Sequence, residues 1–572
     1  MSIHSTTSLE SEKIQDSDFV PQPLADSSSC RSLHLSRNPT NVSELSRIIT
    51  AIRDDHLLDN EEFEEYRDRL PEQTLVEQLD SKQADTHPES ETLKEDHPID
   101  GPFAFWQAFL VMLMMFSTWG VNAAFGVFLN YYLNSNAFPS ATMYDYALMG
   151  GVIVFLAQFL APLTVLAVKT VGQTPVNLLG ITIQTLAYML ASVSTKFWEV
   201  FVCQGVMVGL SFAMIFIPGT LILPTWFRKQ KSTAMGIAVA GGGLGGVVFA
   251  LSLNRVIEET GNQKWALRMV GIISFCVSCF AAAFMRPRNP QKIPYRANLT
   301  KANILSNIKT ILDISTFKEY PIALLAIWFG IILIGYILVL YSFSNYAVSV
   351  GLSHTQASNL LAILNGAQVV GRPTVGQLGD IFGRYNTASF FCAYVAVLLF
   401  AFWLNASSYA SLIVLAVLLG GPVGLGSTMA QSLALDSLEL LDKPGQLPAV
   451  WSILNIVVGL FSLPAEVIGL KLKKGNGPKS YRNAQIFTGC CFTACLLIGL
   501  INREWAVRIT FIERRRQTLE HLNTILNSEN FSEDDEKSEE CILLQARLDR
   551  YDQLLKNGPL CFFLRLFYPL RV

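Results

Sequence analysis

Long apolar runs alternate with short polar stretches from residue 100 to residue 501. The first six runs occupy residues 104–131, 146–168, 175–194, 198–226, 232–254 and 266–285, and a second six occupy 320–343, 355–377, 386–404, 408–433, 447–471 and 483–501. A helix needs roughly 20 apolar residues to cross a hydrocarbon layer about 30 Å thick. Lipid cannot form hydrogen bonds with backbone N–H and C=O groups, and a helix satisfies these groups within one segment. The runs therefore predict helices rather than strands. The expected fold class is all-α integral membrane, with twelve transmembrane helices in two six-helix bundles.

Composition and charge support a membrane protein. Of the 572 residues, 51% are hydrophobic and 16% are charged, whereas soluble proteins carry about 25% charged residues. Residues 1–99 hold 22 acidic and 9 basic side chains, and residues 502–572 hold 12 and 11, which leaves the long middle net basic. No basic-then-apolar stretch opens the chain, so the first membrane helix, rather than a cleavable signal peptide, is expected to direct insertion.

The pattern predicts five segments. They are an acidic, mostly disordered cytosolic tail (1–99), an N-terminal six-helix bundle (100–285), a cytosolic linker (286–319), a C-terminal six-helix bundle (320–501) and a cytosolic helical tail (502–572). One short helix is expected near Asn60–Leu79, and helical spacing recurs at 514–526 and 541–555. The final stretch, Pro559–Val572, is apolar but too short to span. It is interpreted either as an anchor in the membrane interface, assisted by lipidation of Cys561, or as a hydrophobic tail packed on its neighbouring helices.

Basic residues in the short loops favour cytosolic termini, because loops rich in Lys and Arg stay in the cytosol. The linker contributes seven of them, Arg286, Arg288, Lys292, Arg296, Lys301, Lys309 and Lys318. One loop disagrees. It follows the eleventh run, on the outside in this topology, and carries Lys471, Lys473, Lys474, Lys479 and Arg482. It is either an external rim that attracts anions or a sign that the twelfth helix lies elsewhere.

Residues 376–384 read Gly-Gln-Leu-Gly-Asp-Ile-Phe-Gly-Arg, between the eighth and ninth runs. The stretch resembles the G-x-L-x-D-x-x-G-R loop signature of the major facilitator superfamily, whose two halves are six-helix repeats around a midplane site. Gly376 and Gly383 permit a tight turn, so Asp380 can face a helix N-terminus of the same half while Arg384 pairs nearby. We expect a charge relay that holds the inward gate closed; the alternative is an ordinary capped turn.

Two further stretches resemble those of monocarboxylate transporters and their fungal relatives within that superfamily. Residues 100–106 (Asp-Gly-Pro-Phe-Ala-Phe-Trp) resemble the D-G-G-x-G-W opening of the first helix, with proline for the second glycine. Residues 226–241 begin Trp-Phe-Arg-Lys, which resembles the aromatic-aromatic-basic-basic signature of the fifth helix. The resemblance implies a fungal monocarboxylate-transporter-like permease, and Arg228 and Lys229 are expected to take part in gating. Small residues four apart predict close helix contacts there, namely Gly241 with Gly245 and Gly242 with Gly246.

Arg372, in the eighth run, is the leading candidate for substrate binding. An arginine in a membrane helix is costly and usually faces a partner or a wet cavity, and its planar fork can hold a carboxylate through two hydrogen bonds. The family resemblance implies an arginine here that binds the substrate anion, one turn after an aspartate that helps to carry a proton. Gln368 stands at that earlier position, and Asn365 lies on the same segment; both are further substrate-binding candidates. The alternative is a gate residue whose side chain reaches lipid phosphates.

Two polar residues in other runs complete the candidate set. Animal members of the family place a lysine in the first helix; this chain has Asn122 there, which can still donate a hydrogen bond to a ligand. Glu466, in the eleventh run, is the remaining acid within the membrane segments and the candidate for proton coupling. The alternative is that Glu466 pairs with the nearby Lys471–Lys474 cluster.

These features predict a secondary transporter, namely a symporter of a small monocarboxylate and protons that works by alternating access. Two alternatives stay open: a facilitator of a larger or neutral solute such as a flavin, which the missing lysine and aspartate favour, and a non-transporting sensor that signals through its tails. The expected partners are a small organic solute, protons, the lipid bilayer and cytosolic regulators of the tails, with no nucleic acid. The plasma membrane is the expected location, with a vacuolar or other internal membrane as the alternative.

No catalytic constellation stands out in the sequence. His354 is the only histidine between residues 100 and 501, and the ten cysteines are scattered without metal-binding or disulfide spacing. No glycine-rich phosphate-binding loop is present. The sequence therefore predicts no enzyme, no catalytic residue, no cofactor and no metal site.

Overall fold

The computed structural model of the chain describes residues 97–526 and 535–571, apart from 136, 140, 289–299, 314, 476 and 478. The predicted helix near Asn60–Leu79 and the rest of 1–96 lie outside the described residues. The described residues fall into two compact units: the smaller comprises 515–526 and 535–551, and the larger comprises the described residues of 97–514 and 552–571. The described part of the smaller unit is helical and holds a core of its own, formed by Leu522, Cys541, Leu544 and Leu548.

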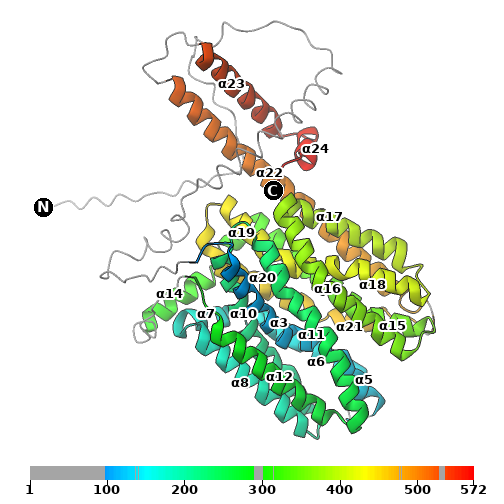
Figure 1. The fold of residues 1–572 in the computed structure, drawn as a ribbon. Coiled ribbons are helices and arrows are strands. Elements are labelled where there is room, and N and C mark those ends of the chain that lie inside the picture. Colours follow the sequence, from blue (N-terminus) through cyan, green and yellow to red (C-terminus); the bar gives the residue numbers. More distant parts are fainter. Residues whose placement is uncertain are drawn as a thin grey trace, which may run out of the picture. The chain divides into compact units, whose positions relative to one another are not determined.

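Six helical segments follow one another in the first half of the larger unit (Figure 1). The first comprises α3 (Pro102–Met115), η2 (Phe116–Gly120), α4 (Val121–Ala123) and α5 (Phe125–Asn134). The second is the bent pair α6 (Met143–Phe159) and α7 (Ala161–Val171), and the third is α8 (Gln173–Val193). The fourth comprises α9 (Phe197–Val200), η3 (Phe201–Met207) and α10 (Val208–Trp226); α11 (Lys231–Thr260) and α12 (Gln263–Phe284) complete the half.

The second half repeats this organisation after a connection that contains α14 (Lys301–Ile311) and η4 (Thr316–Lys318). Its first three segments are α15 (Tyr320–Ser349), α16 (His354–Phe382), and α17 (Arg384–Val397) with η5 (Leu398–Trp403). The next two are α18 (Tyr409–Val423) with α19 (Leu425–Leu440), and η6 (Pro444–Gln446) with α20 (Leu447–Ser462) and α21 (Ala465–Leu472). The last is α22 (Arg482–Leu526), and α23 (Asp535–Leu555) and α24 (Pro559–Phe567) follow it. Because α22 begins at Arg482, the basic loop does not displace the expected twelfth helix.

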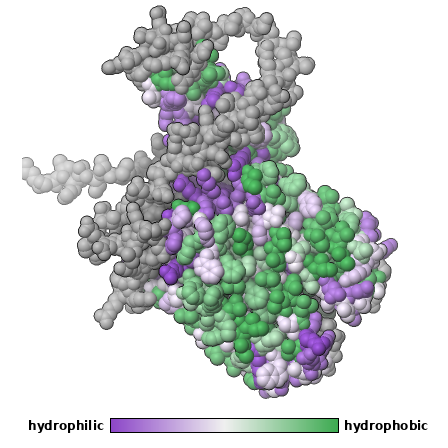
Figure 2. Space-filling view, in the orientation of Figure 1, coloured by the Kyte–Doolittle hydropathy of each residue, from purple (hydrophilic) through white to green (hydrophobic). Residues whose placement is uncertain are grey.

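The larger unit has the surface of a membrane protein. Among the described residues, ten helices are long and apolar enough to cross a membrane, and the bent pair of α6 and α7 would add an eleventh. The 29-residue α16 falls outside that group because polar residues, Asn365, Gln368, Arg372 and Asp380 among them, interrupt its apolar sequence. Figure 2 shows a hydrophobic band over the helices on the visible face, with hydrophilic residues gathered towards both ends. The twelve-helix count and the cytosolic placement of the termini stay predictions.

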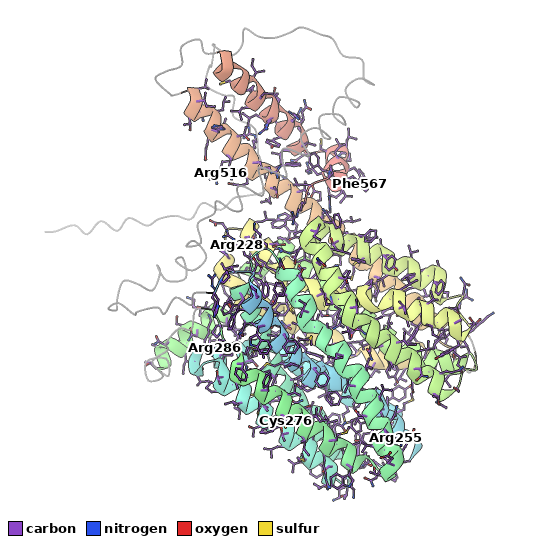
Figure 3. The ribbon with its side chains drawn as sticks, viewed as in Figure 1. Arg228, Arg255, Cys276, Arg286, Arg516 and Phe567 are labelled. Carbon is purple, nitrogen blue, oxygen red and sulfur yellow. The ribbon has the colours of Figure 1, made fainter. Side chains whose placement is uncertain are left out.

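Two ends of the helices can be distinguished. Arg228 and Arg286 lie at one end, and Arg255 lies at the other (Figure 3). Asp380 accepts hydrogen bonds from the backbone at the start of α11, close to Arg228. We therefore call this end the Asp380 end; it is the end that the sequence predicts to be cytosolic.

Glycines of α11 bring the two halves together. One face of α11 meets the first segment of its own half, where Gly241 and Gly245 pack against backbone atoms of α3 and η2. Another face meets α16 of the other half: a Cβ added at Gly243 would lie 2.6 Å from the carbonyl oxygen of Asn365. The predicted close approach at the small residues of α11 is confirmed, and it holds α16 with its polar residues against α11.

Gly243→Ala is expected to destabilise the protein, because its new methyl group would press on the α16 backbone. Overpacking of this kind costs about 1–3 kcal/mol. The matched control is Gly126→Ala in α5, where an added Cβ meets nothing within 4 Å and the alanine slightly favours the helix. Thermal unfolding of the purified protein should give a lower midpoint for Gly243→Ala and an unchanged or higher one for Gly126→Ala. Equal midpoints would contradict the close approach.

Candidate functional site

Asp380 joins the two halves at one end of the helices. It lies in the last turn of α16, one turn before Gly383 (φ 92°) ends that helix. Its carboxylate accepts hydrogen bonds from the backbone N–H of Ser232 (3.1 Å) and Thr233 (2.7 Å) and from the Thr233 hydroxyl (2.8 Å). The helix N-terminus that it caps is therefore that of α11, in the opposite half. The expectation of a cap within the same half is wrong, because α11 crosses to pack directly on α16.

A network of charges surrounds this cap. Arg384, the first residue of α17, donates to Asp380 from Nε (3.0 Å) and Nη2 (2.9 Å) and to Asp436 of α19 from Nη1 (2.5 Å). Lys231 of α11 pairs with Glu439 of α19 and lies 3.9 Å from Asp436. The Lys231 pairs join the two halves, whereas Arg384 pairs within its own half and reaches the other half through the Ser232 hydroxyl (3.0 Å). Here the structure contains the kind of charge relay that the sequence predicts.

The loop that precedes α11 is held by the start of the first helix. The Asp100 carboxylate accepts hydrogen bonds from the backbone N–H groups of Arg228 (3.2 Å), Lys229 (3.0 Å) and Gln230 (3.2 Å). The Lys229 carbonyl in turn accepts a hydrogen bond from Arg384 (3.2 Å). The Asp-Gly motif and the Trp-Phe-Arg-Lys motif, far apart in sequence, are thus joined by hydrogen bonds. Arg228 and Lys229 take part in these hydrogen bonds through their backbone atoms.

A second layer of contacts closes the same end more deeply. The backbone carbonyl of Thr220 on α10 accepts from Gln431 of α19 (3.0 Å), and its hydroxyl accepts from the Trp451 indole of α20 (3.1 Å). All three residues are almost completely buried. Gly376 contributes by letting α16 approach the backbone of Ser232. Polar contacts between the halves therefore extend inward from the charged rim.

Arg372 is enclosed by segments of both halves. Its side chain, with 5% of its surface exposed, lies on α16. Nη1 donates to the Val239 carbonyl of α11 (2.6 Å), and Nη2 donates to the Tyr336 hydroxyl of α15 (2.9 Å). Gly424, at the break between α18 and α19, makes room for the guanidinium, since a Cβ there would lie 2.6 Å from Nε. The side chain therefore points into the protein and does not reach lipid phosphates.

A chain of hydrogen bonds links Arg372 to two other predicted residues. The Tyr336 hydroxyl donates to Gln368 Oε1 (3.1 Å), and Gln368 Nε2 donates to Asn365 Oδ1 (3.0 Å). Donors are left over at both ends, because Arg372 Nε and Asn365 Nδ2 are buried without a hydrogen-bond partner. The ion pairs of the described residues do not include Arg372. The cluster thus has surplus donors and a buried positive charge, which is the chemistry of an anion site.

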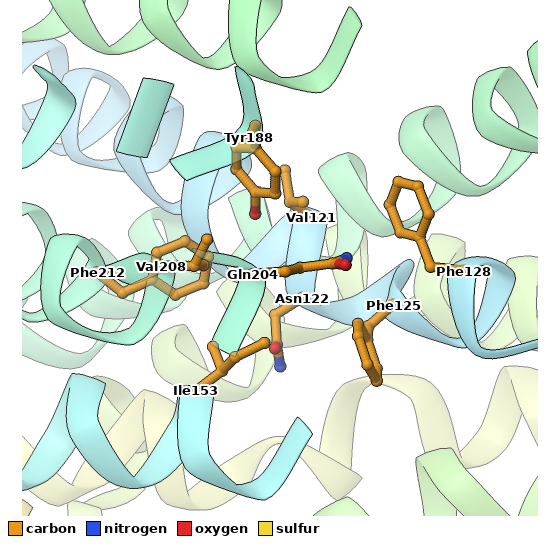
Figure 4. Close-up of a pocket in the computed structure, with 9 residues that line it drawn as sticks. All are labelled: Val121, Asn122, Phe125, Phe128, Ile153, Tyr188, Gln204, Val208 and Phe212. Carbon is orange, nitrogen blue, oxygen red and sulfur yellow. The ribbon is translucent and has the colours of Figure 1, made fainter. Parts of the chain in front are cut away.

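None of the hydrogen bonds of the described residues joins Asn122 to this cluster. It lines a cavity of about the size of a water molecule within the first half, together with the polar residues Gln204 and Tyr188 and an apolar wall of Val121, Phe125, Phe128, Ile153, Val208 and Phe212 (Figure 4). The Tyr132 hydroxyl donates to Gln204 Oε1 (2.8 Å). Asn122 follows the π-helical stretch η2, and Gln204 lies within η3; such irregular turns widen a helix locally and recur at functional sites.

Glu466 is half-buried at a contact between the halves. It lies at the start of α21, where its carboxylate oxygens come within 2.7 and 2.8 Å of the position that a Cβ at Gly150 of α6 would occupy. Its Oε2 atom is buried and has no hydrogen-bond partner. The described residues show no ion pair between Glu466 and the lysines that follow it. Tyr341 of α15, whose hydroxyl also lacks a partner, is close enough to interact electrostatically with Glu466.

Sequence reasoning did not identify several residues of these sites. Tyr336 lies in an apolar run, and no pattern marks it as the residue that holds Arg372. Asp436 and Glu439 carry a weak signal, because they are two carboxylates three residues apart at the end of a membrane segment and so share one helix face. The partner of Arg372 on α11 is a backbone carbonyl, which leaves no trace in a sequence.

Comparison with known proteins gives a consistent assignment. Residues 107–466 match the family described as Major Facilitator Superfamily. The chain is 38% identical over 478 residues to the "Uncharacterized transporter ESBP6" of Saccharomyces cerevisiae, covering 83% of this chain and 70% of that protein. It is 31% identical over 428 residues to the "Probable transporter MCH2" of the same yeast, covering 73% and 84%.

A solved structure shares the fold. The crystal structure of the human organic anion transporter MFSD10 (TETRAN) matches with a TM-score of 0.50 and 15% sequence identity. The match covers 70% of this chain and 98% of that one. At this identity the likeness concerns the arrangement of helices alone.

Asp380→Ala is expected to open the Asp380 end. The test measures labelling of a cysteine placed at the buried Ser432, whose hydroxyl accepts from Ser232 at 2.8 Å, in a chain whose own cysteines are replaced. Because losing one partner of a buried ion pair costs about 3–5 kcal/mol, labelling by a polar maleimide from that side should accelerate at least about tenfold. Glu259→Ala, which removes an exposed pair with Arg255, is the control and should change nothing. Equal labelling rates in both variants would refute the gate.

Proposed function

The chain belongs to the Major Facilitator Superfamily, and we propose that this permease carries a small monocarboxylate together with a proton by alternating access. It is a multi-pass membrane protein whose relatives are fungal transporters, and its activity is the transport of a small solute rather than catalysis. The identity of the solute, the proton coupling and the plasma membrane as its location are the parts that we propose.

The buried Arg372 without a carboxylate partner carries this proposal. A guanidinium removed from water costs several kcal/mol unless charge and hydrogen bonds compensate for it. Here it has one carbonyl, one hydroxyl and the face of the Tyr336 ring, whose centre lies 5.5 Å away. A carboxylate would supply the missing negative charge and an acceptor for Nε. The site therefore favours an anion.

Alternating access assigns the gating roles. In the closed Asp380 end, the Asp380 cap holds α16 against the start of α11, and hydrogen bonds from Arg384 to Ser232 and Lys229 hold α17 there. Gly376 and Gly383 allow the tight packing and the turn at this point. Opening exchanges these contacts for water, and α11, α15 and α16 then present Arg372 to the solvent. We propose that Arg228 and Lys229 move with the Asp100-capped loop during this step.

We propose Glu466 as the proton-coupling group. Its carboxylate lies at the contact between α6 of one half and α21 of the other, against the backbone at Gly150. An ionised carboxylate whose Oε2 atom is buried without a hydrogen-bond partner is unfavourable, whereas a protonated one is tolerated. Protonation would therefore favour the closed contact between α6 and α21, and loss of the proton would favour its opening. This links the proton to the movement rather than to the anion site itself.

A facilitator of a larger or neutral solute is the second candidate. It is favoured by two positions at which the chain departs from the monocarboxylate pattern: Gln368 replaces the expected aspartate, and Asn122 stands in a first helix that lacks the lysine. Both side chains are neutral hydrogen-bonding groups. Uptake of labelled carboxylates and of a flavin into the same proteoliposomes distinguishes the two candidates. Only the solute that the protein carries should show an uptake rate that saturates as its concentration rises.

Arg372→Ala is expected to abolish carboxylate uptake. Hydrogen bonds to charged groups contribute about 1.5–3 kcal/mol each, so kcat/KM in proteoliposomes should fall at least about tenfold. Arg372→Lys should restore little, because an ammonium cannot make the planar two-point contact. The control is Arg268→Ala on α12, an arginine bonded to Ser192 and stacked on Trp265; it should transport normally. Uptake by Arg372→Ala at the parental rate would exclude an anionic cargo at this site.

Glu466→Gln is expected to uncouple transport from the proton gradient. Wild-type uptake should rise when the side of entry is made acidic, whereas the variant should show no response, since an amide mimics the protonated carboxyl at every pH. Exchange of labelled for unlabelled carboxylate without a gradient should persist, because Arg372 is untouched. The control is Glu259→Gln, at an exposed position. A variant that retains the gradient response would rule out Glu466 as the coupling group.

A further inference from the structure

The helix α24 presents an apolar stripe that is exposed among the residues that the structure describes. In α24 the exposed fractions are 66% for Leu560, 56% for Phe563 and 76% for Phe567. Positions spaced by three and four residues lie on one face of a helix, so the three side chains form one continuous stripe. Figure 3 labels Phe567 on this helix. Three large side chains exposed together on nine residues are uncommon unless the surface has a partner.

The opposite face of α24 is fixed to the helical bundle. Arg565, with 4% of its surface exposed, donates to the Glu504 carboxylate of α22 at 2.6 Å. Arg503 of α22 donates to the carbonyls of Arg565 (3.2 Å), Leu566 and Tyr568 (2.7 Å). These buried charge-assisted contacts set the rotation of α24 about its axis. The contacts with α22 therefore keep the three apolar side chains of the stripe on the outer face of α24.

The attachment point lies where the helices leave the hydrophobic band. Directly beside Arg503 and Glu504, Trp505 of α22 forms a ring pair with Tyr320 (6.2 Å between ring centres), the first residue of α15. The Asn502 side chain reaches the Pro321 carbonyl at the same level (3.4 Å). Tryptophan and tyrosine gather at the boundary between membrane and water. The contacts with α22 thus place α24 at the depth of the lipid headgroups.

The rest of the C-terminal segment continues from this level to the gate. The Leu570 carbonyl accepts a hydrogen bond from Asn386 (2.9 Å), and Arg571 donates to the carbonyl of Asp380. Next to Asp380, Ile381 and Phe382 expose 49% and 62% of their surfaces. An exposed apolar surface at the end of α16 therefore lies close to the residues that follow α24.

We propose that α24 is a membrane-interface helix whose Leu560, Phe563 and Phe567 insert into the lipid leaflet at the Asp380 end. The partner of this surface is the bilayer itself, at the boundary between headgroups and acyl chains, where amphipathic helices lie flat. Lys556, exposed one turn before the helix, is placed to meet anionic headgroups. The bilayer then fastens the segment that ends on the carbonyl of the gate residue Asp380. This inference is independent of the cargo.

Photocrosslinking of the full-length protein in liposomes of phosphatidylcholine and phosphatidylserine tests the proposal. p-Benzoylphenylalanine replaces Phe563 or Phe567 in the test chains, Asn557 in an exposed control, and the buried Leu566 in a second control. Lipid adducts detected by mass spectrometry should be at least about tenfold more abundant at Phe563 and Phe567 than at Asn557, because only the stripe lies in the acyl region. Leu566 should crosslink within the protein.

Two outcomes would overturn the proposal. One is a lipid yield at Phe563 no higher than at Asn557. The other is a dominant crosslink from Phe563 to protein, which would assign the stripe to a second copy of the chain or to another of its segments. A second variant gives an independent measurement: in Phe563→Ser with Phe567→Ser, backbone amides of 560–567 should exchange hydrogen at least about tenfold faster in liposomes, since the lipid no longer holds the helix. Unchanged exchange would also refute the insertion.

Discussion

The rest of the structure depends on one carboxylate that caps a helix of the opposite half. The first backbone N–H groups of α11 have no partner within their own helix, and Asp380 of α16 supplies one while it also holds Arg384. Glycine lets the two helices touch along their length, so the cap and the backbone contact reinforce each other. With α11 and α16 fixed in this way, Arg372 Nη1 lies 2.6 Å from the carbonyl oxygen of Val239, and the guanidinium is enclosed.

In this enclosed position the positive charge of Arg372 is only partly compensated. Arg372 is kept from water by a backbone carbonyl and a tyrosine hydroxyl, neither of which carries a formal charge. Each contact is weaker than the one a carboxylate would make. The polar contacts at the Asp380 end compensate for this by joining the halves through the ion pairs of Lys231 with Asp436 and Glu439 and through the buried Thr220 cluster. The contacts of the Asp380 end and the buried Arg372 thus lie on the same two helices, α11 and α16.

The same logic explains why α16 falls outside the helices that are apolar enough to cross a membrane. It carries the Arg372 cluster and Asp380 on one 29-residue element. Sequence analysis marked four of its polar residues because charged and amide groups are conspicuous in an apolar run. Tyr336 was missed because a tyrosine in a membrane helix is ordinary until its hydroxyl is seen between Arg372 and Gln368. The acids of α19 were missed because a helix end commonly carries such residues.

The sequence by itself determined the membrane class, the two groups of helical segments and the small-residue faces, because hydrophobic length and spacing are local properties of the chain. It also marked Arg372, Glu466 and the Asp380 motif as unusual. Only the tertiary structure decided which half Asp380 caps, that Asn122 lines a cavity within the first half, that Glu466 meets the backbone at Gly150 rather than its neighbouring lysines, and that α24 turns its apolar face outward. These depend on pairings between residues more than a hundred positions apart or on a burial pattern, and local spacing does not encode them.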